Sequence, residues 1–131
     1  MITEILKVKT SQNKEAVEIT DLVNDLITKS KVKSGLCHLF VKHTTAALTT
    51  GEVGEGTDED LLEIVQKMIP KINFRHLHNP EHAPDHMVGS VVGPSLTIPI
   101  SGGQLDLGHW QRVLLIEMNG PRQREIVVTI S

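Results

Sequence analysis

The sequence predicts an α+β fold, an α/β sandwich with a mainly antiparallel sheet of about seven or eight strands and three helices. Three observations support this prediction. Both ends of the chain carry short apolar segments with strand-like patterns, the middle carries apolar residues at helical spacing, and close turns join the C-terminal strands. A chain of 131 residues can form one hydrophobic core, so we expect residues 1–131 to be a single domain.

The N-terminal segment predicts an opening hairpin. Leu6 and Val8 alternate with lysines, and after a polar turn Val17 and Ile19 lie on either side of Glu18. This alternation is typical of two half-buried strands joined by a short loop. We therefore expect the two strands to pair with each other.

A helix and a strand are expected next. Thr20 is a suitable helix N-cap, and Gly35 a suitable stop after a lysine-rich last turn. The segment 36–43 then alternates as a strand, and His43 ends its apolar face. His43 is either a packed core or interface residue or is delivered by the strand end into a pocket. Cys37 lies on the same face, where a thiol is usually inert packing.

Two more helices are predicted in the middle of the chain. Thr57 is a candidate N-cap for a helix whose apolar stripe extends to Pro70. Pro84 suits the first turn of a third helix, because that position needs no amide donor. This helix is expected to end before Gly93.

The C-terminal part is expected to form a meander of strands. The apolar runs 113–116 and 126–128 predict strands that are buried on both faces, by helices, sheet or another subunit. Glu117 follows the first run, so an arginine such as Arg122 or Arg124 neutralises it, or it belongs to a site. The four expected strands cover residues 95–100, 104–107, 111–118 and 124–130.

Composition excludes several classes of function. A net charge of −3 and 2% aromatic residues provide neither the basic field nor the stacking surface that nucleic-acid binding needs. No apolar run approaches a membrane span, and the first residues lack the pattern of a signal peptide. One cysteine permits no internal disulfide. We expect a cytoplasmic protein with neither nucleic acid nor membrane as a partner.

The segment from residue 74 to residue 93 carries four of the seven histidines of the chain. Imidazoles at this density suggest either a site that binds a metal ion or substrate, or a solvated loop without a function of its own. Ser90 follows the last of these histidines by four residues and shares its helix face. The four histidines are His76, His78, His82 and His86.

Several motifs together resemble the YjbQ family, over nearly the whole chain. HTTAAL from His43 resembles the family's strand end, and Glu52 resembles its loop glutamate. His76 and His86 resemble the two histidines that flank its variable loop. The most specific motifs are SLTIPISGGQLDLGHWQRVLLIE, from residue 95 to residue 117, and GPRQR, from residue 120 to residue 124. His78 and His82 fall outside the family pattern.

The resemblance implies a homotrimer with an α/β sandwich fold and a site near the subunit interface. It also implies a weak or secondary thiamine-phosphate synthase activity, which joins hydroxymethylpyrimidine pyrophosphate to thiazole phosphate. The expected ligand is therefore a small phosphorylated molecule.

The first functional hypothesis is a metal-dependent enzyme in which His43, His76 and His86 bind a divalent cation. Glu52 either completes the metal site or acts as a base, so Glu52, His43 and His86 are the candidate catalytic residues. Three histidines suit a zinc-like ion or manganese, whereas a departing diphosphate would favour magnesium that arrives with the substrate. The candidate substrate-binding residues are Ser90, Gln111, Arg122 and Arg124.

Two alternatives use the same residues. One is a metal-dependent phosphate hydrolase, in which Glu52 activates a metal-bound water. The other is a non-catalytic oligomeric protein that binds a metal ion or a small ligand. Trp110 is either a packing anchor or a platform for a ligand.

Overall fold

The computed structural model describes residues 1–76 and 79–131. Its described part contains eight strands and three helices, which confirms the predicted α+β class. A short 3-10 turn, Pro80–His82, precedes the third helix. The elements are β1 (Ile2–Lys9), β2 (Glu15–Glu18), α1 (Thr20–Ser30), β3 (Ser34–Val41), β4 (Ala46–Gly51), α2 (Thr57–Lys67), α3 (Ala83–Val92), β5 (Ser95–Ser101), β6 (Gln104–Leu105), β7 (Arg112–Glu117) and β8 (Gln123–Ile130).

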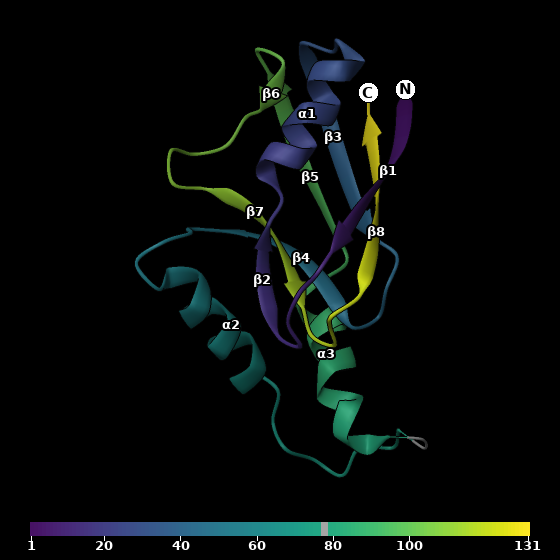
Figure 1. Ribbon diagram of the computed structural model, residues 1–131, viewed down its shortest axis with the longest axis vertical. Helices are drawn as coiled ribbons and strands as arrows, with labels where there is room; N and C mark the ends of the chain where they lie inside the picture. Colours follow the sequence, from purple (N-terminus) through teal and green to yellow (C-terminus); the bar gives the residue numbers. More distant parts are fainter. Residues whose placement is uncertain (77–78) are drawn as a thin grey trace.

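The strands form two antiparallel sheets instead of the single sheet expected (Figure 1). The larger sheet has the order β1-β8-β3-β5-β6, and the smaller has the order β2-β7-β4. The expected opening hairpin is therefore wrong, and of the expected meander only the first hairpin, between β5 and β6, is formed. β1 pairs with β8 and β2 with β7, because the chain passes from one sheet to the other between β1 and β2 and again between β7 and β8.

These two connections run side by side. The backbone N–H of Thr10 donates to the carbonyl of Arg122 at 2.9 Å, and the N–H of Gly120 donates to the carbonyl of Asn13 at 3.0 Å. Paired crossovers of this kind hold the two sheets in register at one end of the sandwich, and Figure 1 shows both loops at the same end.

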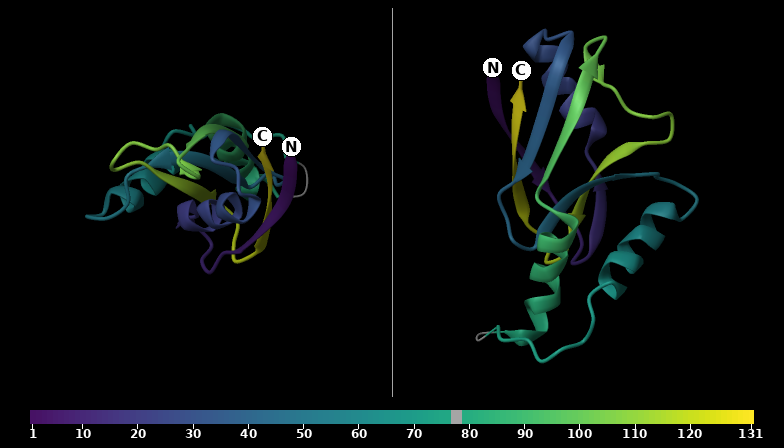
Figure 2. Two further views of the ribbon diagram at one scale, coloured as in Figure 1. Left: turned by 90° about the horizontal axis from the view of Figure 1, so that it is seen from above. Right: turned by 180° about the vertical axis from the view of Figure 1, so that it is seen from behind.

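Figure 2 shows the layers of the fold, and the described residues form two hydrophobic cores between them. The first lies between the larger sheet and a layer that consists of α1 and the smaller sheet. The second lies between the smaller sheet and the helices α2 and α3. In β7, Val113 and Leu115 face the first core while Leu114 and Ile116 face the second, so this strand is buried on both faces as predicted.

The outer face of the larger sheet carries apolar side chains that remain exposed in the single chain. Ile5, Leu36 and Phe40 are exposed by 46%, 49% and 42%. β8 therefore alternates between buried Ile126 and half-buried Val127, and this chain covers only one of its faces. The sequence predicted that helices, sheet or another subunit would bury the other face of β8. None of the described elements buries that face.

The two ends of α1 differ from the sequence prediction, because tertiary contacts engage the residues that were expected to cap the helix. Thr20 is the first residue of α1, not its N-cap, and its Oγ1 accepts a hydrogen bond from the N–H of Val113 at 2.8 Å. The helix ends at Lys31, which has a φ of 64°. Gly35 instead belongs to β3, where a Cβ atom would lie 1.9 Å from the carbonyl oxygen of Ser131.

The other two helices, α2 and α3, form where the sequence predicts them. Gly56, with a φ of 81°, is the N-cap of α2 in place of Thr57. α3 has Pro84 in its first turn and ends before Gly93, as predicted. Within the described residues, no helix is both long enough and apolar enough to span a membrane.

Candidate functional site

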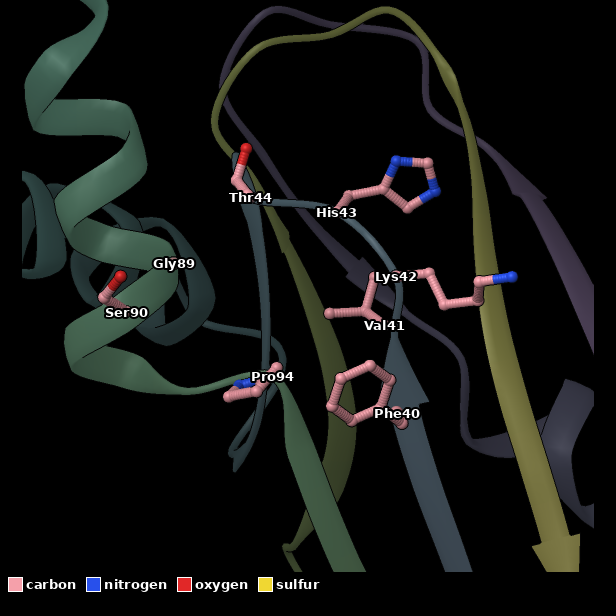
Figure 3. A pocket seen from close by; sticks show the side chains of 8 residues that line it. All are labelled: Phe40, Val41, Lys42, His43, Thr44, Gly89, Ser90 and Pro94. Atoms are coloured by element: carbon pink, nitrogen blue, oxygen red, sulfur yellow. The ribbon is translucent and has the colours of Figure 1, made fainter. Parts of the chain in front are cut away.

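A cavity of about 580 Å³ lies between the end of β3 and the C-terminal half of α3 (Figure 3). Its volume is in the range of small-molecule sites. Apolar and hydrogen-bonding groups both contribute to the wall. The lining residues are Phe40, Val41, Lys42, His43, Thr44, Gly89, Ser90 and Pro94.

Close backbone packing positions the two sides of this cavity. A Cβ atom on Gly89 would lie 2.4 Å from the carbonyl oxygen of Thr44, so only glycine lets α3 approach the chain here. The N–H of Val41 donates to the carbonyl of Pro94 at 2.9 Å, and the N–H of Leu48 donates to the carbonyl of Gly93 at 3.0 Å. These contacts place Ser90 across the cavity from the end of β3.

His43 lies in the loop after β3, on the β8 side of the cavity (Figure 3). Its Nε2 accepts a hydrogen bond from the backbone N–H of Glu125 at 3.0 Å. Burial lowers the pKa of His43, and the positive charge of Arg124 lowers it further. The carboxylates of Glu125 and Glu117 act in the opposite direction but do not prevail, so the imidazole is neutral at pH 7.

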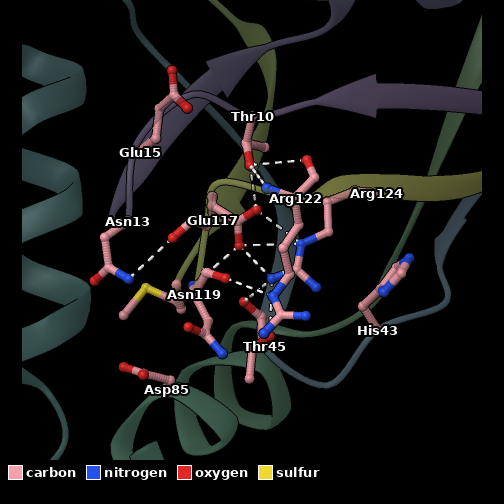
Figure 4. A network of polar contacts seen from close by, with 12 residues as sticks. Thr10, Asn13, Glu15, His43, Thr45, Asp85, Glu117, Asn119, Arg122 and Arg124 are labelled. Carbon is pink, nitrogen blue, oxygen red and sulfur yellow. Dashed lines mark hydrogen bonds and ion pairs between the residues drawn. The ribbon is translucent and has the colours of Figure 1, made fainter.

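A buried ion pair between Glu117 and Arg124 lies to one side of His43 (Figure 4). The Nε of Arg124 donates to Glu117 Oε1 at 2.9 Å, and its Nη2 donates to Glu117 Oε2 and to Thr45 Oγ1, the latter at 2.9 Å. Thr10 Oγ1 donates to Glu117 Oε1 at 2.6 Å. Of the two possibilities for Glu117, the structure supports neutralisation by an arginine.

The ionised form of Glu117 is stabilised by its partners. Burial raises the pKa of this carboxyl, but hydrogen bonds from Arg124, from Thr10 and from the N–H of Asn119 lower it more, so the pKa is below its usual range. Arg124 is 2% exposed and its Nε and Nη2 are engaged, so in this structure it has a structural position and not that of the predicted substrate clamp. Arg122 is exposed, and its Nε donates to the carbonyl of Asn119 at 2.7 Å.

Two of the predicted histidine ligands meet at the start of α3. The rings of His76 and His86 are 5.1 Å apart between centroids. His76 Nδ1 accepts a hydrogen bond from the N–H of Asn79 at 3.1 Å. His82 instead contacts Asp85, with 3.2 Å between Nδ1 and Oδ2. His78 lies outside the described residues.

Asp85 also anchors this segment to the sheets, which the sequence did not reveal. Lys14 Nζ donates to Asp85 Oδ1 at 2.9 Å and to the carbonyl of Met118 at 2.5 Å. Asp85 is 6% exposed. A lysine and an aspartate 71 positions apart give no local pattern, so only the fold brings them together.

Glu52 and Gln111 lie at the opposite end of β4 from His43. His43 precedes this strand and Glu52 follows it, and six residues at about 3.3 Å each separate the two ends by roughly 20 Å. The Nε2 of Gln111 donates to Thr50 Oγ1 at 3.1 Å, while its Oε1 accepts from the N–H of Gly108. The expected pairing of Glu52 with His43 is therefore not formed within one chain, because β4 is extended between them.

The expected three-histidine metal site is likewise not assembled within the chain. Among the described residues, no three His, Cys, Asp or Glu side chains are placed to hold one metal ion. His76 and His86 are neighbours, but His43 lines a different cavity and its Nε2 already accepts a hydrogen bond. Trp110, beside Gln111, is 70% exposed and is not a core anchor in the single chain.

Sequence reasoning missed Lys42 and Thr44 as cavity residues. Both flank His43, and their position at the end of an alternating strand was the available signal. The sequence could not show that α3 packs against this strand end.

Together, the two stacked sheets and the cavity at the β3 end define a small α+β protein with a cavity lined by both apolar and hydrogen-bonding groups. The family model described as UPF0047 protein YjbQ-like matches residues 4–131. The chain therefore belongs to the YjbQ, or UPF0047, family.

Relatives and a solved structure match this chain over nearly its whole length. The chain is 38% identical to a UPF0047 protein of Mycobacterium tuberculosis, covering 97% of this chain and 95% of that protein. It is 35% identical to a UPF0047 protein of Archaeoglobus fulgidus, covering 94% and 96%. The crystal structure of a YbjQ-like protein from Sulfolobus solfataricus matches with 34% identity and a TM-score of 0.90, covering 98% of this chain and 95% of that one.

We predict that Arg124→Met lowers the free energy of unfolding by about 3–5 kcal/mol, because it leaves the carboxylate of Glu117 buried without its charged partner. Urea denaturation measures the change. The matched control is Arg112→Met, which breaks the half-exposed pair with Glu18 and is expected to cost at most about 1 kcal/mol. The double variant Arg124→Met/Glu117→Leu should recover part of the loss. Equal effects of Arg124→Met and Arg112→Met would contradict the assigned role.

Proposed function

We propose that the chain binds a small phosphorylated molecule in the cavity between β3 and α3. The observation that carries the proposal is the set of hydrogen-bonding groups around one cavity, from His43 and Thr44 on one side and Ser90 on the other. Lys42 also lines the cavity, with its side chain extending towards β8 (Figure 3), and Arg122 is close enough to affect the pKa of His43. Phe40 and Pro94 offer apolar surface for the organic part of the ligand.

The reaction we propose is of the thiamine-phosphate synthase type, as the family resemblance implies. The thiazole nitrogen attacks the methylene carbon of hydroxymethylpyrimidine pyrophosphate, so a C–N bond forms and a C–O bond breaks. The diphosphate leaves with the electron pair of the broken bond. The thiazole nitrogen carries no proton, so the step needs stabilisation of the departing anion and no general base.

This requirement fits the residues of the cavity. We propose that Lys42 and Arg122 supply the cations for the leaving diphosphate and that the hydroxyls of Thr44 and Ser90 add donors. A hydrolase would instead need a base to activate water, and Glu52 is roughly 20 Å from His43 within the chain, by the length of β4. Within one chain, the geometry thus supports the synthase more than the hydrolase.

Magnesium remains the cation that we propose for the synthase reaction. The described lining residues include no carboxylate, so magnesium fits this cavity only if it arrives bound to the diphosphate of the substrate.

We predict that Lys42→Met and Ser90→Ala each weaken binding of inorganic diphosphate by roughly tenfold, because each removes one donor to the anion. Isothermal titration calorimetry measures the affinity. Lys7→Met and Ser101→Ala are the matched controls on exposed strand positions outside the lining, and they should bind as the wild type does. The wild type should also release diphosphate when both thiamine precursors are supplied. If the Lys42 and Ser90 variants bind diphosphate as tightly as the wild type does, the diphosphate site is not in this cavity.

A second candidate function is binding of a transition metal by His76 and His86. Two imidazole nitrogens bound to one zinc-like ion at about 2.1 Å and near-tetrahedral angles place the ring centroids roughly 5 Å apart. The observed separation is 5.1 Å. This separation suits two ligands of a zinc or manganese site only if His76 gives up the hydrogen bond that its Nδ1 accepts from the Asn79 N–H, and water, substrate or a second copy would complete the site. This site would serve either catalysis or the non-catalytic role of a metal-binding protein.

We predict that His76→Ala and His86→Ala each abolish retention of zinc after exhaustive dialysis, because each removes one of two paired ligands. Elemental analysis of the purified protein measures the metal content. His38→Ala is the control, since this histidine is exposed on the outer face of the larger sheet. His82→Ala is expected to matter less than His76→Ala. A metal-free wild type, or unchanged zinc in His86→Ala, would eliminate the metal site.

We also propose that the chain forms a homotrimer through the outer face of the larger sheet. Ile5 and Leu36 are exposed there at 46% and 49%, and the cavity begins beside the same face at Phe40. Light scattering is expected to give three times the 14.4 kDa of the chain. The double variant Ile5→Glu/Leu36→Glu should shift the mass to that of a monomer, whereas Leu22→Glu on α1 should not. A wild-type monomer would refute the assembly.

A further inference from the structure

The hydrogen bond to His43 assigns the proton of its imidazole. The backbone N–H of Glu125 can only donate, so His43 Nε2, 3.0 Å away, accepts through its lone pair. A neutral imidazole has one N–H, which must then be on Nδ1. The orientation is fixed by a backbone group of β8, so it persists as long as β8 is paired with β3 and β1.

The surroundings also keep His43 uncharged. A protonated ring would direct an Nε2–H towards the Glu125 N–H, so two donors would face each other at 3.0 Å. The titratable groups around His43 are the cations Arg124 and Arg122 and the carboxylates Glu125 and Glu117, with Lys42 adjacent in the sequence. Burial and the arginines prevail over the carboxylates in lowering its pKa.

We infer that His43 acts as a neutral hydrogen-bond donor, through Nδ1–H, to an oxygen of the ligand. It is then neither a metal ligand nor a general base, since Nε2 is occupied and Nδ1 carries the proton. This role differs from the catalytic and metal-binding roles predicted from the sequence. This inference deepens the proposed function and rests on it. A donor at Nδ1 requires that the ligand group at this position be an acceptor, such as a phosphate oxygen.

The same assignment separates His43 from the histidine pair at the start of α3. His76 Nδ1 accepts from a backbone N–H, but the ring also faces His86 and its cavity is formed by other residues. His43 shares its cavity with hydroxyl groups and a lysine and with no second histidine among the described lining residues. Anion binding at His43 and metal binding at His76 and His86 are therefore separable by mutation.

The first test is the tautomer in the free protein. Two-bond nitrogen–proton NMR spectra of uniformly labelled protein at pH 7.5 distinguish Nδ1–H from Nε2–H imidazole, with His43→Gln used to assign the signal. The expected result is Nδ1–H for His43, with a conversion to the charged form centred below the pKa of an ordinary histidine. A signal from Nε2–H, or from imidazolium at pH 7.5, overturns the inference without affecting the proposed ligand.

The second test uses two substitutions that each retain one half of the imidazole. In His43→Asn the side-chain amide nitrogen takes the position of Nδ1 and keeps the donor. In His43→Gln the amide oxygen takes the position of Nε2 and accepts from the Glu125 N–H, while the position of Nδ1 is left without a donor. Titration with inorganic diphosphate should show His43→Gln at least about tenfold weaker than the wild type. His43→Asn should recover a large part of this loss.

The outcomes are distinct. Stronger binding by His43→Gln than by His43→Asn overturns the donor role, because the acceptor would then be the important half. Equal losses in both variants overturn it as well. A wild type that binds no diphosphate refutes the proposed function, and the tautomer spectrum, measured without ligand, tells that failure apart from a wrong proton assignment.

Discussion

The buried ion pair between Glu117 and Arg124 is the interaction on which the arrangement of this protein depends. Glu117 ends a strand of the smaller sheet and Arg124 begins a strand of the larger one, so the pair joins the two sheets at their paired crossovers. Thr10 and Thr45 complete its hydrogen bonds from two further connections. Two charges buried at 0% and 2% exposure are stable only when every partner is in place, which makes this corner of the sandwich intolerant of rearrangement.

The buried ion pair also determines the position of the residues that line the cavity. Thr45 receives the Arg124 guanidinium, and the residues before it, His43 and Thr44, form the cavity wall. The N–H of Glu125, next to Arg124, fixes the His43 ring. Because α3 approaches Thr44 at a glycine, Ser90 reaches the same space. A structural ion pair therefore determines which hydrogen-bonding groups a ligand meets, although neither of its members lines the cavity.

The strand β4 divides the candidate site residues into two groups. His43 and Ser90 lie near its start, whereas Glu52 and Gln111 lie near its end. If both groups act on one ligand, they must come from different copies of the chain, because the strand is extended. The exposed apolar face beside the cavity and the exposed Trp110 beside Gln111 are compatible with such an arrangement in the proposed homotrimer.

The sequence by itself determined the class of fold, the third helix with Pro84 in its first turn and its end before Gly93, the double burial of β7 and the two possible roles of Glu117. Periodicity and local turn chemistry specify such features. Tertiary structure alone decided that the strands form two sheets, that Arg124 rather than Arg122 neutralises Glu117, and that His43 is separated from His76 and Glu52. Strand pairing and side-chain convergence depend on contacts between distant residues, such as Lys14 with Asp85, which leave no periodic pattern in the sequence.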